Sequence, residues 1–237
     1  IALAVLALAV LTFREFNGLR SLAAATEMRE EAEAVVASDD GPRAKVLVRR
    51  LIAYQAKDPS TAAQRQAMET HLDEIIDGRG MLTLADRLLL LPRDEQARLV
   101  IAGAAKRVSV VTAISPRAIV DILFVAAQSV MLTRRIADIY GARPGTLGFF
   151  RLGRSILGHL AITGGVAITD SVLSQLVGHG VAARLSAKLG EGVLNGLLTA
   201  RVGLAAVAAC RPLPFLAAEE PKLQDVAADI LTNPLGK

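Results

Sequence analysis

The stretch SPRAIVDILFVAAQSVMLTRRIADIYG, from Ser115 to Gly141, decides the fold class of this 237-residue chain. Ser115 followed by Pro116 indicates a helix start, because Ser is a favoured N-cap and Pro suits the first helical turn. The residues that follow are largely apolar and do not alternate with polar residues as a half-buried strand would. Gly141 is a helix stop. We therefore expect one long helix here.

The rest of the chain also predicts helices, since no segment alternates apolar and polar residues over a useful length. Ser38–Gly41 ends a charged helix, and Pro42 opens the next one. Thr83, with Asp86 three residues later, resembles a capping box that opens a further short helix. The last part of the chain predicts a pair of helices that ends before Arg211. The expected fold class is all-α.

The first residues, IALAVLALAVLTF (Ile1–Phe13), are uncharged and apolar. Thirteen helical residues rise about 20 Å, less than the ~30 Å hydrocarbon core of a bilayer. We expect the C-terminal part of a truncated transmembrane helix that leads into a cytoplasmic helical bundle. A buried soluble helix and a signal-peptide core are the alternatives. Arg14 and Arg20 follow, and the positive-inside rule places that end in the cytoplasm.

Composition and charge divide the chain into four expected parts. Residues 1–13 are the membrane segment, 14–111 a helical stalk and small helical unit, 112–217 a Gly/Ala-rich helical domain, and 218–237 an acidic tail. The third part holds ten Lys and Arg residues and four acids, a net charge of +6 compared with +4 for the whole chain. This bias favours a membrane surface or an acidic partner.

Several segments of the third part together resemble a known family. They are SPRAIVDILF, RRIADIYGARPG, LGRSILGHLAITGG and KLGEGVLNGLLTARVGLAAVAACRPLPF. The series is similar to the C-terminal domain of the YcjF-like family of bacterial inner-membrane proteins. The resemblance implies an inner-membrane protein with most of this chain in the cytoplasm and a P-loop, GTPase-like partner. It carries over no catalytic residues.

Basic and aromatic residues of the third part form a candidate surface for a partner protein or for lipid headgroups. Its members are Arg134, Arg135, Arg143, Phe149, Phe150, Arg151 and Arg154. The alternative is a solvated helix face with both Phe residues in the core. Nucleic acid is not an expected partner, because the basic residues are dispersed and aromatic residues for base stacking are few.

Other residues of this region are candidates for structural roles. The candidate ion pairs join Asp121 or Asp170 to Arg201, and Asp138 to Arg134 or Arg135. The candidate helix-packing glycines are Gly190, Gly192, Gly196 and Gly203, whose small side chains let two helices approach closely. They do not form a phosphate-binding loop, because no strand precedes them and no Lys-Ser/Thr follows.

The sequence favours no catalytic, cofactor or metal site. The histidines lack metal-ligand spacing, and the single Cys210 excludes an internal disulfide. Ala118–Leu132 is slightly short for a span and is expected to be a buried core helix, and Arg201 argues against a span over Leu194–Cys210.

We therefore expect a non-enzymatic docking platform or regulator for a GTPase-like partner. The sequence leaves open whether the protein forms a homo-oligomer. The first alternative is a membrane-remodelling or pore-forming module that inserts Ala118–Leu132 and Leu194–Cys210. The weakest alternative is an enzyme that uses His159, Asp170 or Cys210.

Overall fold

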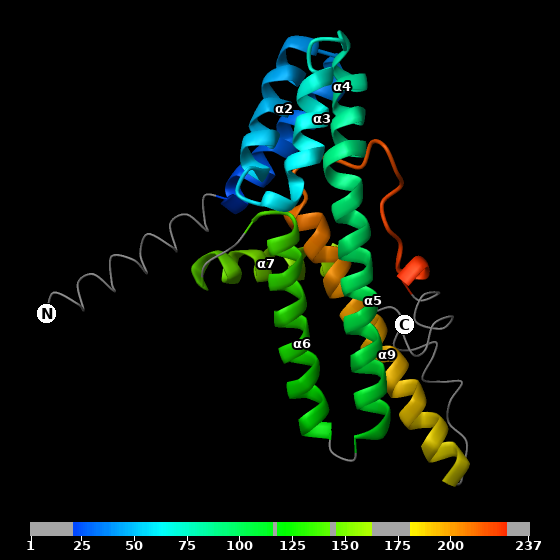
Figure 1. Ribbon diagram of the computed structural model, residues 1–237. Coiled ribbons are helices and arrows are strands. Elements are labelled where there is room, and N and C mark those ends of the chain that lie inside the picture. Colours follow the sequence, from blue (N-terminus) through cyan, green and yellow to red (C-terminus); the bar gives the residue numbers. More distant parts are fainter. Residues whose placement is uncertain (1–20, 116–117, 143–145, 163–180, 227–237) are drawn as a thin grey trace, which may run out of the picture. The chain divides into compact units, whose positions relative to one another are not determined.

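The computed structural model describes residues 21–115, 118–142, 146–162 and 181–226 (Figure 1). Every regular element within these ranges is a helix, which confirms the all-α fold class. Ile1–Phe13 lies outside the described residues, so the truncated transmembrane helix and the cytoplasmic bundle stay predictions.

The described elements are helices throughout. Residues 21–38 are helical. After them come α2 (Gly41–Gln55), the 3₁₀ turn η1 (Pro59–Thr61), α3 (Ala62–His71), α4 (Gly78–Ala85), the π-helix η2 (Asp86–Leu90), α5 (Leu91–Ile114), α6 (Ala118–Ile139), α7 (Thr146–Ile162) and α9 (Val181–Cys210).

Side-chain caps explain where two of the helices begin. The Asp40 carboxylate accepts a 2.9 Å hydrogen bond from the Arg43 N–H, and Pro42 occupies the first turn of α2. In the same way, Asp77 accepts a 2.7 Å bond from the Gly80 N–H at the start of α4. Each cap satisfies a backbone donor that has no partner within the helix. The predicted start at Pro42 is confirmed.

The predicted capping box at Thr83 is wrong, because Thr83 lies inside α4. Its hydroxyl donates a 2.8 Å bond to the Arg79 carbonyl one turn earlier. The helix does not restart near Pro92 either, since α4 continues through η2 into α5. Pro92 has no backbone N–H, so one α-helical hydrogen bond would be missing there. The wider turn of the π-helix changes the hydrogen-bonding pattern just before this proline.

Glycine ends helix α6 but does not interrupt helix α9. Gly141 adopts a φ of +79° just after α6, and the Ala142 N–H donates a 2.8 Å bond to the Ala137 carbonyl, so the predicted stop is confirmed. The predicted helix pair near the end of the chain is instead the single 30-residue helix α9. The helix is rich in Ala and Leu, which favour it strongly enough to continue it through its glycines.

The chain forms two compact units, each built from segments distant in sequence. Unit 1 comprises residues 1–97, 137–152 and 207–220, and unit 2 comprises 98–136, 153–206 and 221–237. Helices α5, α6, α7 and α9 therefore each contribute residues to both units. The predicted domain division at residues 111–112 stays a prediction.

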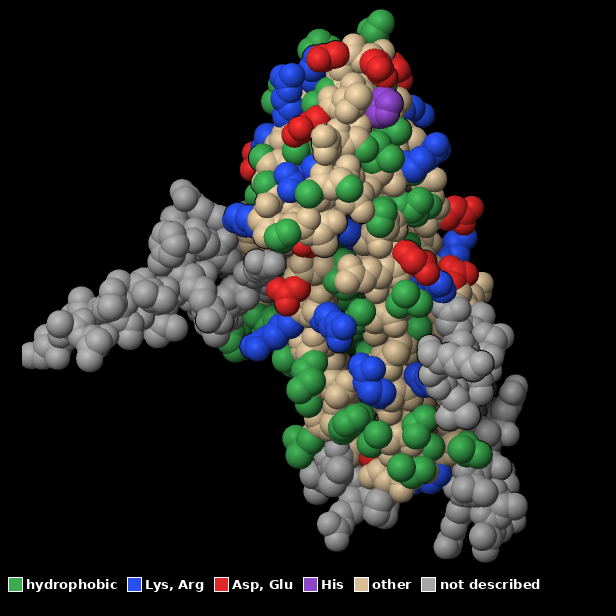
Figure 2. Space-filling model, viewed as in Figure 1, with side chains coloured by type: hydrophobic (Ala, Val, Ile, Leu, Met, Phe, Trp, Pro, Cys, Tyr) green, Lys and Arg blue, Asp and Glu red, His purple; other side chains and the backbone are tan. Residues whose placement is uncertain are grey.

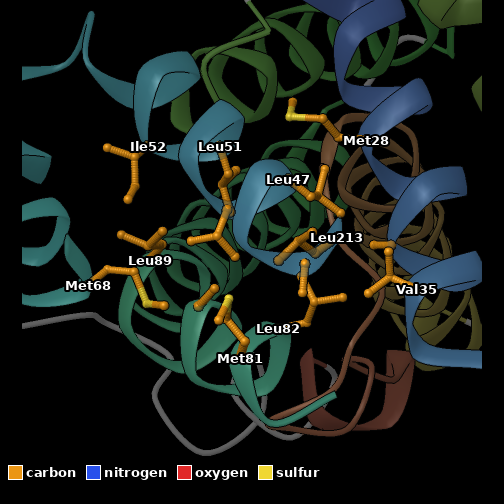
Figure 3. Close-up of a cluster of buried hydrophobic side chains, with 14 of the residues drawn as sticks. Met28, Val35, Leu47, Leu51, Ile52, Met68, Met81, Leu82, Leu89 and Leu213 are labelled. Carbon is orange, nitrogen blue, oxygen red and sulfur yellow. The ribbon is translucent and has the colours of Figure 1, made fainter. Parts of the chain in front are cut away.

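Unit 1 has a hydrophobic core of Leu, Met, Val and Ala side chains (Figure 3). The residues labelled in that view are Met28, Val35, Leu47, Leu51, Ile52, Met68, Met81, Leu82, Leu89 and Leu213. Replacing one of the large side chains by Ala costs about 2–5 kcal/mol. Leu213 follows α9 in the sequence, so the segment after α9 completes this core.

Candidate functional site

Unit 1 contains a buried charged network centred on Arg211. The Arg211 side chain is 1% exposed and pairs with the carboxylates of Asp86 and Asp94. Its Nη2 lies 2.9 Å and its Nε 3.1 Å from the two oxygens of Asp94, which gives the two-pronged geometry that guanidinium and carboxylate favour. The Phe215 ring covers the guanidinium at 3.9 Å.

The same network fixes the segment that follows α9. Arg211 Nη1 donates to the carbonyls of Leu213 and Pro214 at 2.6 and 2.7 Å. Asp86 Oδ2 accepts from the N–H groups of Leu216 and Ala217 at 2.9 and 2.8 Å. The Arg211 guanidinium therefore has backbone acceptors, and the Asp86 carboxylate has backbone donors. These bonds attach the backbone of the segment to η2.

Tyr140 completes the network from the end of α6. Its hydroxyl donates a 2.6 Å bond to Asp94 Oδ1. Burial, and then the neighbouring Asp94 charge, raise the pKa of Tyr140 above its usual value. Burial lowers the pKa of Arg211, but Asp94 and Asp86 outweigh it and the net shift is upward. Tyrosine and arginine are thus both held in their ordinary protonation states.

This arrangement favours a structural role for the network. Every carboxylate oxygen of Asp86 and Asp94 has a partner, so neither group is available as a general acid or base. The sequence analysis missed the network, because Arg211 lies 117 and 125 residues from its partners in the chain. The charged pair Asp86-Arg87 within the largely apolar stretch Leu82–Leu91 was the available signal.

A small cleft in unit 1 is lined by Tyr54, Gln55, Lys57, Asp58, Arg93, Asp138, Tyr140 and Gly141. It has room for about one water molecule and is far smaller than sites for organic ligands. Arg93 donates to the Ile139 carbonyl and lies 2.8 Å from Asp58. The hydrogen bond from Arg93, followed by bonds from Ser60, lowers the pKa of Asp58 to about 2.

In unit 2, α9 packs closely against α5 through glycines. A Cβ on Gly192 would clash with the Ser109 carbonyl, and one on Gly196 would clash with the Ser109 hydroxyl and lie 2.9 Å from the Ala105 carbonyl. A Cβ on Gly203 would lie 2.6 Å from Ile101. Gly190 is half-buried on the same helix. Only glycine allows this separation without a shift of the neighbouring helix.

The candidate ion-pairing residues of unit 2 lie in different surroundings. Asp121 is buried, and the partner that the structure shows for it is Lys188, with Nζ 3.7 Å from Oδ2. Lys188 lies closer to Glu191, at 2.9 Å. The expected pairing of Asp121 with Arg201 stays a prediction. Asp170 lies outside the described residues.

The basic and aromatic candidate surface divides into described and undescribed members. Arg134 and Arg135 of α6 and Arg151 and Arg154 of α7 are exposed. The expected ion-pair partner of the α6 arginines, Asp138, is exposed as well, and that pairing stays a prediction. Arg143 lies outside the described residues.

The two phenylalanines of that surface lie on α7 and differ in exposure. Phe150 is 77% exposed, whereas Phe149 is half-buried. Phe150 is therefore not a core residue, and it leaves a large apolar group on the surface next to the exposed Arg151.

Of the three residues that an enzyme was expected to use, only Cys210 has a described side chain. Cys210 is fully buried. The side chain of His159 and all of Asp170 lie outside the described residues. Within the described ranges, no group of three or more His, Cys, Asp or Glu residues is placed to hold a metal ion. The absence of an enzymatic activity stays a prediction.

Two helices carry long apolar segments, and among the described residues one of them has the length and hydropathy of a membrane span. In α9, Lys188–Cys210 spans 23 residues with a mean hydropathy of 1.7 and is long and apolar enough to cross a membrane, although it contains Arg201. The expected burial of Ala118–Leu132 is wrong for part of α6, because Ile122 and Leu123 are 68% and 66% exposed. The inward side of that helix is occupied partly by polar residues.

Comparison with known proteins places this all-helical chain in a family. Residues 76–234 match the family described as a domain of unknown function, DUF697. A UPF0283 membrane protein of Bradyrhizobium diazoefficiens is 51% identical over 226 residues, which cover 95% of this chain and 66% of the relative. A UPF0283 membrane protein of Mesorhizobium japonicum is 52% identical, over 94% of this chain and 62% of the relative. Another, of Rhizobium rhizogenes, is 47% identical, over 100% of this chain and 66% of the relative. No solved structure matches the chain.

The geometry and the match together define an all-helical protein with a buried arginine network and a glycine-packed helix pair. The chain belongs to the DUF697 family. It spans 62–66% of the length of the three relatives, which are bacterial proteins named as membrane proteins. At this level the comparisons agree with the resemblance found in the sequence. The GTPase-like partner implied by the resemblance stays a prediction.

Proposed function

We propose that this protein is a non-enzymatic helical protein of the bacterial inner membrane that acts as a docking platform or regulator for a P-loop, GTPase-like partner. The membrane location is supported by the names of the relatives and by the apolar segment Ile1–Phe13. Arg14 and Arg20 favour a cytoplasmic position for the rest of the chain. The partner class is supported by the resemblance to the YcjF-like family.

The observation that carries the docking role is the exposed face of α7. Phe150 stands 77% exposed, and Arg151 and Arg154 on the same helix are exposed too. The neighbours Leu152 and Ile156 are buried, so the helix is anchored while this face stays open. A large aromatic group beside arginines is the composition found at the energetic centres of protein interfaces.

The 190–203 segment contributes little to such a surface. Gly192, Gly196 and Gly203 are buried against α5. Only the outward residues Val193 and Leu198, 45% and 46% exposed, remain for a partner. We therefore centre the docking surface on α7.

Co-purification from native membranes tests the proposal. The tagged full-length protein is isolated in mild detergent with a non-hydrolysable GTP analogue, and bound proteins are identified by mass spectrometry. We expect a P-loop protein to be retained by the wild type and by Val46→Ala, a matched control that alters a side chain 56% exposed on α2. We expect Phe150→Ala to lose it. Equal recovery with both variants, or no P-loop protein, contradicts the proposal.

A second function is favoured by α9, whose segment Lys188–Cys210 has the length and hydropathy of a membrane span. A membrane-remodelling or pore-forming protein would use such a helix conditionally. Release of a trapped dye from anionic liposomes by the full chain supports this second function. Retention of the dye at protein levels that saturate the liposomes contradicts it.

A further inference from the structure

The outward side of α6 in unit 2 consists of two rows of exposed residues spaced four apart, which therefore share one side of the helix. The first row is Ile122, Ala126, Val130 and Arg134, and the second row is Leu123, Ala127, Met131 and Arg135. Each row is apolar over three successive positions and then ends in an arginine. These eight residues are named the α6 face. Figure 2 shows hydrophobic side chains gathered on the surface over the lower turns of α6.

The opposite side of α6 is not uniformly apolar, as the inner side of a water-soluble core helix usually is, because it carries polar residues beside the buried Leu132 and Ile136. Asp121 and Thr133 are buried, and Gln128 and Ser129 are half-buried. Several large apolar side chains face outward, and Met131 is 62% exposed. Apolar groups outside and polar or small groups inside are the arrangement of helices surrounded by lipid.

Helix α9 also carries exposed apolar side chains within unit 2. Its buried positions there include the small residues Gly192, Gly196 and Thr199, while Leu189 and Val193 are 53% and 45% exposed. Unit 1 has Leu and Met side chains inside. Unit 2 also buries Ile101, Val108 and Ile136, so the outward apolar groups are a feature of the faces of α6 and α9 and not of the whole unit.

The dimensions and the charge of the α6 face identify its occupant. From Ile122 to Met131 the helix rises about 14 Å, close to half of the ~30 Å hydrocarbon core. Arg134 and Arg135 follow within the next turn, at the depth where basic side chains meet lipid phosphates. We propose that the α6 face binds one leaflet of an anionic bilayer, with its apolar rows on acyl chains and its two arginines on headgroup phosphates.

A lipid surface suits the α6 face better than a second copy of this chain. The face contains no carboxylate, so a second copy placed face to face would add no negative charge opposite the arginine end of the face. Anionic headgroups supply negative charge at that end of the face and hydrocarbon along the rest. The proposal goes beyond the docking function, because it requires no P-loop partner and adds a membrane contact distinct from Ile1–Phe13.

Fluorescence quenching in proteoliposomes tests the proposal. The full chain with Cys210→Ala receives a single cysteine by Ile122→Cys or Met131→Cys, is labelled with the polarity-sensitive fluorophore NBD, and is reconstituted into vesicles of phosphatidylcholine and phosphatidylglycerol. We expect blue-shifted emission that is lost when acyl-chain-labelled doxyl lipid is added and is insensitive to aqueous iodide. Val46→Cys, a similarly exposed apolar position in unit 1, is the matched control, and we expect iodide to quench its label.

Arginine variants test the headgroup contact separately. We expect Arg134→Glu combined with Arg135→Glu to lower the doxyl quenching at position 122 in anionic vesicles, whereas Arg87→Glu, an exposed arginine of unit 1, leaves it unchanged. If Cys210→Ala does not fold, a benzophenone side chain at position 122 replaces the label, and we expect lipid adducts.

Two results overturn the proposal. One is quenching of the labels at positions 122 and 131 by iodide to the same extent as at Val46. The other is insensitivity to both quenchers, accompanied by protein adducts at position 122, which would show that a second copy or another protein covers the face.

Discussion

Arg211 and Asp94 form a buried ion pair in unit 1, with Nη2 of the arginine 2.9 Å from Oδ2 of the aspartate. The two residues lie 117 positions apart in the chain, so the pair ties the segment after α9 to the start of α5. Asp86 and Tyr140 complete its coordination. The pair is the point at which three distant segments of unit 1 meet.

Removal of the arginine should destabilise the protein strongly. In Arg211→Ala, two buried carboxylates lose their compensating charge, and we expect the free energy of unfolding to fall by about 3–5 kcal/mol. Urea unfolding followed by circular dichroism measures the change. Arg87→Ala, next to Asp86 but exposed, should change it by less than about 0.5 kcal/mol. Equal effects of the two variants would show that the network contributes little.

The contact between α9 and α5 predicts opposite effects for two glycine substitutions. Gly192→Ala places a methyl group against the Ser109 carbonyl, and we expect a loss of about 1–3 kcal/mol. Gly158→Ala on α7 meets no atom within 4 Å and should be neutral or stabilising by up to about 1 kcal/mol. Thermal unfolding of both variants measures the difference. A stabilising Gly192→Ala would contradict the close packing.

The two tyrosines of the chain should resist alkaline titration. Burial is the main cause that raises the pKa values of Tyr54 and Tyr140 above about 10, their ordinary value. The unfolded chain ionises first, so the stability that these groups contribute is present below pH ~10 and is lost as the pH rises beyond it. We expect tyrosinate absorbance to appear together with unfolding. Absorbance that develops near pH 10 while circular dichroism stays unchanged would contradict the burial.

The surroundings of Asp58 predict that the free energy of unfolding falls at acidic pH. Its folded pKa is about 2, lowered first by the hydrogen bond from Arg93, whereas an unfolded aspartate titrates near pH ~4. The contribution of ionised Asp58 to the stability of the fold is therefore present above pH ~4 and is lost as the pH falls towards about 2. Because Asp58 is partly exposed, we expect Asp58→Asn to remove only about 1 kcal/mol at neutral pH. Glu69→Gln, an exposed control, should leave the acid profile unchanged.

The sequence predicted those parts of the fold that depend on local signals. The all-α class, the start at Pro42 and the stop at Gly141 follow from capping residues and missing strand alternation. The break at Thr83 was wrong, because η2 keeps α4 and α5 continuous, and a π-helix has no clear local signature.

The candidate site was harder to predict, because its chemistry depends on contacts between distant residues. The network around Arg211 joins residues more than a hundred positions apart, and neither its spacing nor its composition forms a motif. The apolar stretch of α6 was visible in the sequence. Its outward orientation was not, because hydropathy alone does not distinguish a buried core helix from one whose apolar side faces outward.

Photo-crosslinking at Phe150 tests the docking function most directly. A benzophenone side chain replaces Phe150 in the full-length protein, and intact cells are irradiated before the membranes are isolated. We expect one prominent adduct, with a P-loop protein, that is absent when the same group replaces Val46. Adducts with lipid alone, or an identical pattern at both positions, would contradict a docking surface on α7.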